Sequence, residues 1–228
     1  MYNVLQPTFR QIILQDAIFR RVKNLLVFDV DGTIIDSVRS ITRCLIEASS
    51  KFGYEIDDIS EFIGVLKLSQ ALVARGVRKE DVSRILEEYR ACYLSTFAKD
   101  TRPVDGAREA MLKLQKSNIL GILTLKDFKL TEEIIKAFFS GVSFKYIVCG
   151  DRPIQSKTHG LNLIAQESGI ERKNIYYIGD RAEDVKSALE SGIRAVWASY
   201  GLGKEDELTS GWEYLKIKKI QDLVVMFK

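Results

Sequence analysis

The sequence predicts an α/β protein in which helices cover a parallel β-sheet and one helical insertion interrupts that sheet. Three observations support this prediction. Short apolar runs alternate with amphipathic helical patterns, the longest interval between two runs contains only helical patterns, and two aspartates directly follow the first run. Uniformly apolar strands are typical of parallel sheets, because both faces of such sheets are buried.

The apolar runs mark the expected strands. They span residues 25–28, 119–123, 146–148, 175–178 and 193–198. The helical patterns between them span residues 105–117, roughly 129–140, 156–168 and 182–191. This alternation predicts strands joined by helical crossovers. A further amphipathic pattern at residues 8–22 predicts an N-terminal helix, which we expect to pack on the core.

One interval is too long for a simple crossover. A strand–helix–strand unit needs roughly 30 residues, and the chain between Asp29 and Thr124 is about three times that length. The excess predicts helices at residues 37–53, 61–76 and 78–100. Pro103 and Gly106 indicate the return to the sheet. We therefore expect an N-terminal extension at 1–22, a core at 23–36 and 103–228, and a helical domain at 37–102.

Composition and charge narrow the class of protein. The 34 basic and 31 acidic residues are interspersed and give a net charge of +3, so we expect no nucleic-acid partner. The sequence shows no apolar run typical of a signal peptide or a membrane span. Cys44, Cys92 and Cys149 form no CxxC pair, and we expect them to be reduced and buried. A cytoplasmic protein, monomeric or homodimeric and without a membrane partner, is therefore expected.

The sequence DVDGT after the first strand indicates the chemistry. Asp29 and Asp31 lie where open parallel sheets bind ligands, outside the carboxyl ends of the strands. Two carboxylates this close raise each other's pKa unless a cation lies between them, and Mg²⁺ prefers oxygen ligands. Gly32 allows a sharp turn close to an anion. A calcium-binding EF-hand loop is excluded, because Ile34 and Ser40 occupy the positions where it needs Gly and Glu.

Three further short motifs follow at strand ends or at a helix start. They are Thr124 in ILGILTLKD, Lys157 in SKTHGLN, and Asp180 with Asp184 in YYIGDRAEDV. With DVDGT they resemble, in the same order, the four motifs of the haloacid dehalogenase superfamily. The insertion lies where the phosphoglycolate phosphatase-like subgroup carries its helical cap. The resemblance covers about residues 23–228 and implies a Rossmann-like core with an inserted cap.

The resemblance implies a role for each residue. Asp29 would attack phosphorus to form an aspartyl-phosphate. Asp31 would protonate the leaving alkoxide and then accept a proton from water; the family's true dehalogenases lack an acid here. The expected phosphate-binding residues are Gly32, Thr124 and Lys157. The expected ligands of Mg²⁺ are Asp29, Asp31 through its backbone carbonyl, Asp180 and Asp184, with Asp184 instead orienting Lys157 or a bound water as the alternative.

The expected function is Mg²⁺-dependent hydrolysis of a small phosphorylated metabolite, such as phosphoglycolate or a sugar phosphate. Two alternatives stay open. One is a phosphomutase of the β-phosphoglucomutase type, whose cap excludes water from the phospho-enzyme. The other is a non-catalytic binding or regulatory protein that keeps this fold.

The insertion is expected to contact the leaving group. The residues near the family's specificity segment are Phe62, Ile63, Gly64 and Lys67, with Arg75 within reach. Two positions depart from the family pattern. Leu125 follows Thr124 where many relatives have asparagine, and Thr158 follows Lys157 where relatives usually have proline. Neither departure removes a group that is expected to contact phosphate.

Overall fold

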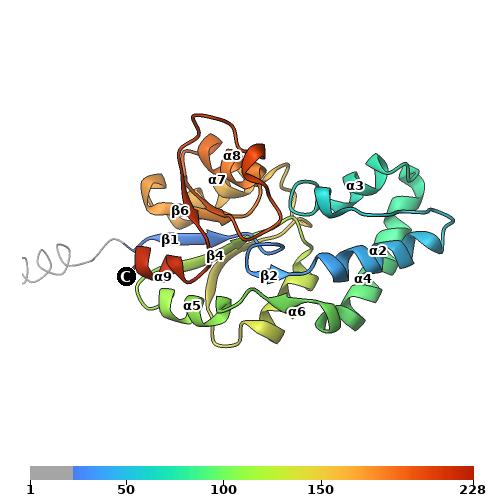
Figure 1. The fold of residues 1–228 in the computed structure, drawn as a ribbon, viewed down its shortest axis with the longest axis horizontal. Coiled ribbons are helices and arrows are strands. Elements are labelled where there is room, and N and C mark those ends of the chain that lie inside the picture. Colours follow the sequence, from blue (N-terminus) through green and yellow to red (C-terminus); the bar gives the residue numbers. More distant parts are fainter. Residues whose placement is uncertain (1–22) are drawn as a thin grey trace, which may run out of the picture.

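A six-stranded parallel sheet forms the core of the computed structural model, which describes residues 23–228 (Figure 1). Its strand order is β5-β4-β1-β6-β7-β8. The strands are β1 (Leu25–Phe28), β4 (Ile119–Leu123), β5 (Phe144–Val148), β6 (Ile175–Gly179), β7 (Arg194–Ala198) and β8 (Tyr214–Ile217). The helix expected at residues 8–22 lies outside the described residues. The predicted parallel α/β architecture is confirmed.

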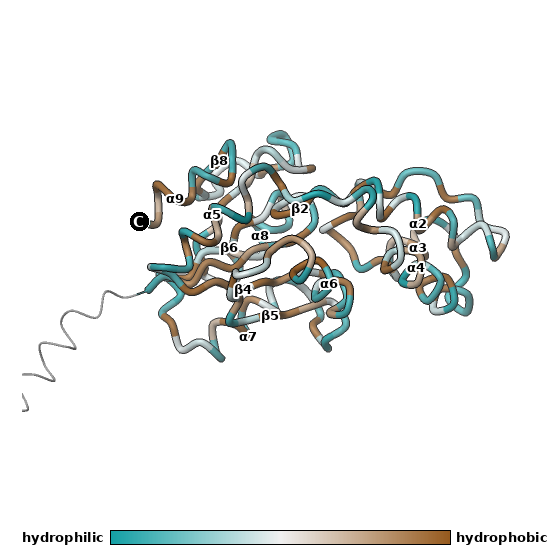
Figure 2. Tube along the Cα trace, turned by 90° about the horizontal axis from the view of Figure 1, so that it is seen from below, coloured by the Kyte–Doolittle hydropathy of each residue, from teal (hydrophilic) through white to brown (hydrophobic). Residues whose placement is uncertain are grey.

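Helices cover both faces of this sheet. They are α5 (Ala107–Leu114), α6 (Phe128–Phe138), α7 (Lys157–Ser168), α8 (Ala182–Glu190) and α9 (Asp222–Met226). Successive residues of a strand point to opposite faces. Leu26 and Phe28 therefore pack with the side chains of α5, α6 and α9, while Leu25 and Val27 pack with those of α7 and α8. The sheet strands are accordingly hydrophobic along most of their length (Figure 2).

Strand β1 lies in the middle of the sheet, between β4 and β6. Leu26 pairs with Leu120 on one side and with Tyr176 on the other. Side chains on both faces of β1 are fully buried, which explains its uninterrupted apolar sequence. The loop that follows β1 is thus held by neighbours on both sides.

A helical segment, residues 38–100, is inserted after β1 and lies beyond the carboxyl ends of the strands (Figure 1). It contains α2 (Val38–Ser50), the short 3₁₀ turn η1 (Ser60–Phe62), α3 (Leu68–Ala74) and α4 (Lys79–Asp100). A two-stranded antiparallel ladder connects it to the core, with β2 (Ile35–Asp36) paired to β3 (Arg102–Pro103). α2 and α4 pack directly on one another.

The expected helix at residues 61–76 is shorter than its pattern predicts. The chain is irregular between Ile63 and Lys67, and α3 begins only at Leu68. Gly64 has a φ of +79°, which breaks any continuous helix and which glycine adopts without a steric penalty. The irregular stretch faces the core rather than solvent, as described below.

The cysteine expectation is wrong for two of the three residues. Cys44 on α2 and Cys92 on α4 form a disulfide, with their Cα atoms 5.6 Å apart. The packing of these two helices brings together cysteines that are far apart in the sequence. Cys149 is free and buried, as expected.

The apolar runs did not predict three of the strands. β8 is an edge strand whose Leu215 and Lys216 are exposed, so it lacks a uniformly apolar sequence. β2 and β3 are only two residues long. Within the described part of the chain, no helix has the length and apolar character needed to cross a bilayer.

Candidate active site

The carboxyl ends of the central strands and the start of two helices converge on one buried group of polar side chains. Asp29 follows β1, and its backbone N–H donates to the Ile178 carbonyl of β6 at 2.9 Å. Asp180 follows β6 on the neighbouring strand, and Asp184 lies in the first turn of α8. Lys157 is the first residue of α7. The sheet register therefore brings together groups that are widely separated in the sequence.

Asp29, Asp180 and Asp184 form an acidic cluster. One carboxylate oxygen from each residue lies within 4.8 Å of the other two, and all three residues are buried. Burial, together with the neighbouring carboxylates, raises the pKa of Asp29 to about 7 and that of Asp180 to about 6. These values describe the protein without a metal ion.

Lys157 joins two members of the cluster. Its Nζ lies 2.9 Å from Asp29 Oδ2 and 2.5 Å from Asp184 Oδ1, and its side chain is 1% exposed. Burial lowers the pKa of Lys157, but the carboxylates of Asp184 and Asp29 raise it by a larger amount. The pKa of Lys157 therefore lies above its ordinary value. The ammonium group balances one of three carboxylates. A hard divalent cation such as Mg²⁺ fits the remaining charge and the oxygen donors.

Backbone and hydroxyl donors fix the orientation of Asp180 and Asp184. The Thr33 hydroxyl donates to Asp180 Oδ1 at 2.9 Å, and the Leu202 N–H donates to Asp180 Oδ2 at 2.7 Å. The Arg181 N–H donates to Asp184 Oδ2 at 2.9 Å. These hydrogen bonds leave little freedom for either carboxylate, so the cluster is preorganised.

Gly32 forms the turn that passes beside the acidic cluster. Its N–H donates to the Ile35 carbonyl at 2.8 Å, so this N–H is not free to bind phosphate. Its φ is +82°, and a Cβ atom at this position would lie 2.4 Å from Asp180 Oδ2. Glycine is required here because the backbone passes directly against the acidic cluster.

The Asp31 carboxylate is not part of this cluster. Its Oδ1 accepts a hydrogen bond from the Ser37 hydroxyl at 2.5 Å and lies 3.2 Å from Lys126 Nζ. Lys126 is itself buried, with its Nζ 4.5 Å from the centre of the Tyr93 ring. The Asp31 carboxylate is therefore held by Ser37 and Lys126 and does not join Asp29, Asp180 and Asp184.

Thr124 lies at the end of β4, next to β1. It is buried, its N–H donates to the Val148 carbonyl at 3.0 Å, and its hydroxyl oxygen accepts a hydrogen bond from the Lys126 N–H at 3.2 Å. The following residue, Leu125, lines the cavity described next. Thr158, the second departure from the family pattern, donates to Glu190 of α8 at 2.9 Å and lies on the surface side of α7.

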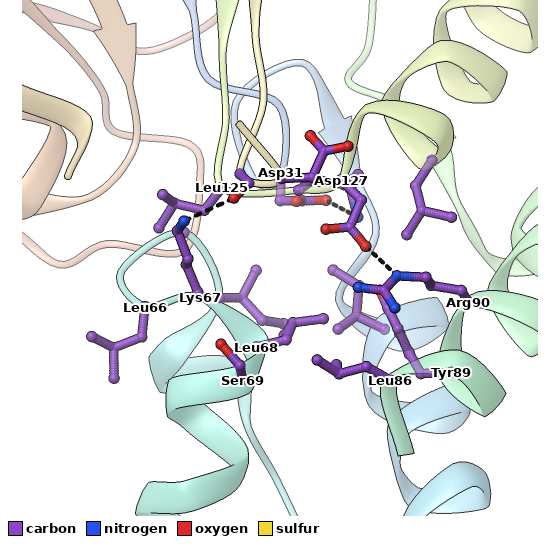
Figure 3. Close-up of a pocket in the computed structure, with 17 residues that line it drawn as sticks. Asp31, Leu66, Lys67, Leu68, Ser69, Leu86, Tyr89, Arg90, Leu125 and Asp127 are labelled. Atoms are coloured by element: carbon purple, nitrogen blue, oxygen red, sulfur yellow. Dashed lines mark hydrogen bonds and ion pairs between the residues drawn. The ribbon is translucent and has the colours of Figure 1, made fainter. Parts of the chain in front are cut away.

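A cavity of about 280 Å³ lies between the core and the helical segment, beside Asp31 (Figure 3). Leucine and isoleucine side chains provide much of its wall, among them Ile63, Leu68, Leu86 and Leu125. Its lining also includes six charged residues: Asp31, Lys67, Arg90, Lys126, Asp127 and Asp151.

Two contacts close this cavity across the boundary between core and helical segment, and both are drawn in Figure 3. Lys67 Nζ donates to the Gly150 carbonyl at 2.8 Å, and Arg90 Nε lies 2.5 Å from Asp127 Oδ2. The first contact joins the start of α3 to the loop after β5. The second joins α4 to the start of α6.

Three of the four residues expected in the specificity segment line the cavity, namely Ile63, Gly64 and Lys67. Phe62 is not among the lining residues. Its ring lies under the Arg75 guanidinium, 5.3 Å from the guanidinium carbon. Arg75 does not reach the site, because it pairs with Glu61 at 2.6 Å and donates to the Asp58 carbonyl.

Four polar residues of the site escaped the sequence analysis: Thr33, Ser37, Lys126 and Arg181. Thr33 belongs to DVDGT itself, and Arg181 directly follows Asp180, so both were adjacent to assigned residues. Ser37 and Lys126 contact Asp31 only because the start of α2 and the loop after β4 meet at this point. No spacing in the sequence indicates that meeting.

Comparison with known proteins places these observations in a family. Residues 26–198 match the sequence model of the haloacid dehalogenase-like hydrolases. The chain is 24% identical over 217 residues to phosphoglycolate phosphatase 1 of Pseudomonas aeruginosa, with 90% of this chain and 79% of that protein covered. It is 29% identical over 202 residues to a 5'-nucleotidase of the same organism, with coverages of 86% and 90%.

Solved structures share the fold. A predicted phosphatase from Clostridium acetobutylicum superposes with a TM-score of 0.78 at 23% identity, covering 90% of this chain and 98% of that one. At this level of identity the likeness concerns the fold. With the family match over most of the described residues and four motifs gathered at one sheet edge, the chain belongs to the haloacid dehalogenase-like hydrolase family.

Proposed function

We propose that this protein is a Mg²⁺-dependent phosphatase that hydrolyses a small phosphorylated metabolite through an aspartyl-phosphate. One observation carries the proposal. The buried Asp29 carboxylate lies in an acidic cluster with Asp180 and Asp184 and contacts Lys157 Nζ at 2.9 Å. Such an arrangement suits an oxygen nucleophile beside a cation site and a fixed positive charge.

Each residue has a defined task in the proposed reaction. Asp29 attacks phosphorus, and the bond to the leaving oxygen breaks while Asp31 donates a proton to that oxygen. Asp31 then accepts a proton from a water molecule that attacks the aspartyl-phosphate, which releases phosphate and regenerates Asp29. Lys157 and the Thr124 hydroxyl bind phosphate oxygens. The Asp31 contacts with Ser37 and Lys126 hold its carboxylate apart from the acidic cluster.

The acidic cluster would hold the cation. Asp29, Asp180 and Asp184 supply carboxylate oxygens, and the Asp31 backbone carbonyl is the fourth proposed protein ligand. When bound, Mg²⁺ neutralises negative charge on the transferring phosphoryl group. The family's phosphatases differ in substrate, as the phosphoglycolate phosphatase and the 5'-nucleotidase among the relatives illustrate. We propose that the leaving group occupies the cavity beside Asp31.

Phosphate release from p-nitrophenyl phosphate, phosphoglycolate, sugar phosphates and nucleoside monophosphates tests this function. We expect release with Mg²⁺ and none with EDTA. Asp29→Asn should abolish release, whereas Asp206→Asn, at an exposed aspartate outside the site, should not change it. Release that persists in Asp29→Asn would contradict the nucleophile. Transfer of phosphate between positions of a sugar without release would favour the mutase.

A further inference from the structure

The side chain of Arg181 is buried at the boundary between the core and the helical segment. The residue is 6% exposed and directly follows Asp180. Within residues 23–228, Arg181 makes no ion pair; its guanidinium donates only to backbone carbonyl oxygens. Burying a guanidinium is costly unless its donors are satisfied. The partners of Arg181 therefore show which contacts the buried guanidinium stabilises.

Two of these partners belong to the helical segment and one to the core. Arg181 Nε donates to the Ile63 carbonyl at 3.0 Å, and Nη2 donates to the Ser60 carbonyl. Nη1 donates to the carbonyl of Leu202 at 3.4 Å, and the N–H of the same residue donates to Asp180. The planar guanidinium offers donors in several fixed directions at once, which a lysine ammonium on the same stem does not.

The segment that Arg181 holds lies directly over Asp29. We call residues 60–64 the covering turn. A Cβ atom built on Gly64 would lie 3.4 Å from Arg181 Cγ and 3.6 Å from Asp29 Oδ2. The arginine side chain and the Asp29 carboxylate thus both approach Gly64 on the side where a Cβ atom would lie. On the far side of Gly64, Lys67 donates to the Gly150 carbonyl, so the stretch is attached to the core at both ends.

We propose that Arg181 is a positioning residue for the reaction, which holds the covering turn at a fixed height above the Asp29 carboxylate. The proposal rests on the proposed function, because the position of the turn matters to the reaction only if Asp29 attacks a phosphoryl group. The covering turn lies against Asp29 at Gly64, and its Ile63 and Gly64 also line the cavity proposed for the leaving group. We therefore expect its displacement to lower kcat as well as kcat/KM, because the geometry at the attacking carboxylate changes.

The test compares Arg181→Met and Arg181→Lys with Arg75→Met as the matched control. Arg75 also contacts the covering turn, because it pairs with Glu61 and lies over the Phe62 ring, but all of its contacts with described residues remain within the helical segment and none reaches the core. For Arg181→Met we expect kcat/KM for p-nitrophenyl phosphate with Mg²⁺ to fall roughly 10- to 100-fold, as for the loss of one or two hydrogen bonds to a charged group. The kcat/KM of Arg181→Lys should fall by less, and that of Arg75→Met should stay within about twofold of the wild-type value.

Amide hydrogen exchange supplies a readout that needs no activity. In the metal-free protein without substrate, peptides spanning residues 60–67 should exchange roughly tenfold faster in Arg181→Met than in the wild type, while peptides from β1 and β6 should not change. Unchanged exchange at 60–67, or an equal loss of kcat/KM in Arg75→Met, would overturn the proposal. If the wild type releases no phosphate, the proposed function fails and the exchange rates alone decide whether Arg181 holds the turn.

Discussion

In the absence of divalent cations, the free energy of unfolding should fall as the pH rises from about 4 to about 7. Burial raises the pKa of Asp29 from 3.8 to about 7 in the folded, metal-free protein. Between these values Asp29 is protonated in the folded chain and ionised in the unfolded chain. Rising pH therefore favours unfolding. The stability that Asp29 contributes is complete below pH 3.8 and is lost as the pH passes about 7.

The size of the effect follows from the shift. Each pH unit in this window costs the folded state about 1.4 kcal/mol, so Asp29 accounts for at most about 4 kcal/mol. Asp180, whose pKa is raised to about 6, acts in the same direction over a narrower window. The two contributions do not add, because they share neighbouring charges.

Urea unfolding at pH 5, 6, 7 and 8, with EDTA and with Mg²⁺, measures this dependence. Because Mg²⁺ binds the ionised carboxylates, the stability that it adds should be small at pH 5 and large at pH 8. The difference between wild type and Asp29→Asn isolates the contribution of Asp29 from other titrating groups. A wild-type stability in EDTA that follows the same pH profile as Asp29→Asn would refute the reasoning.

Three substitutions test other parts of the site. Asp31→Asn should lower kcat/KM, which reports the transfer of the phosphoryl group to Asp29, by roughly 10²- to 10⁴-fold for an alkyl phosphate and by much less for p-nitrophenyl phosphate, because the nitrophenolate leaves without a proton; equal losses in kcat/KM would argue against a proton donor. Gly32→Ala, whose Cβ would meet Asp180 Oδ2 at 2.4 Å, should cost about 4 kcal/mol or more by urea unfolding. Its control Gly53→Ala, also at positive φ but in open space, should cost about 1–2 kcal/mol; equal costs would contradict the close packing. Asp180→Asn should raise the Mg²⁺ concentration for half-maximal activity by roughly tenfold or more, and an unchanged Mg²⁺ titration would exclude Asp180 as a ligand.

Much of the sheet was predictable because its strands are buried on both faces. A uniformly apolar run such as that of β1 leaves few alternatives, and the carboxyl ends of adjacent parallel strands meet at one edge. Asp29 and Asp180 could therefore be grouped from the sequence. β8 was missed for the converse reason, because one side of an edge strand has no strand partner and its residues need not be apolar.

The contacts that depend on helix packing were not predictable. The position of Arg181 against the covering turn and the disulfide between Cys44 and Cys92 both require knowing how the helical segment packs. No local pattern encodes that packing, since the contacting residues are far apart in the chain. Gly64 illustrates the same limit, because a glycine within an apolar helical pattern signals a break but not what the broken segment faces.

The two-residue ladder between β2 and β3 has a consequence for how such a protein can change. Ile35 pairs with Pro103 and Asp36 with Arg102, so the chain leaves the core and returns to it at neighbouring positions. Because this ladder is separate from the six-stranded sheet, a change within the inserted segment need not alter the register of the sheet. The ladder thus makes the helical segment an exchangeable module, in which sequence change can alter the walls of the cavity while the carboxylates at the strand ends remain in place.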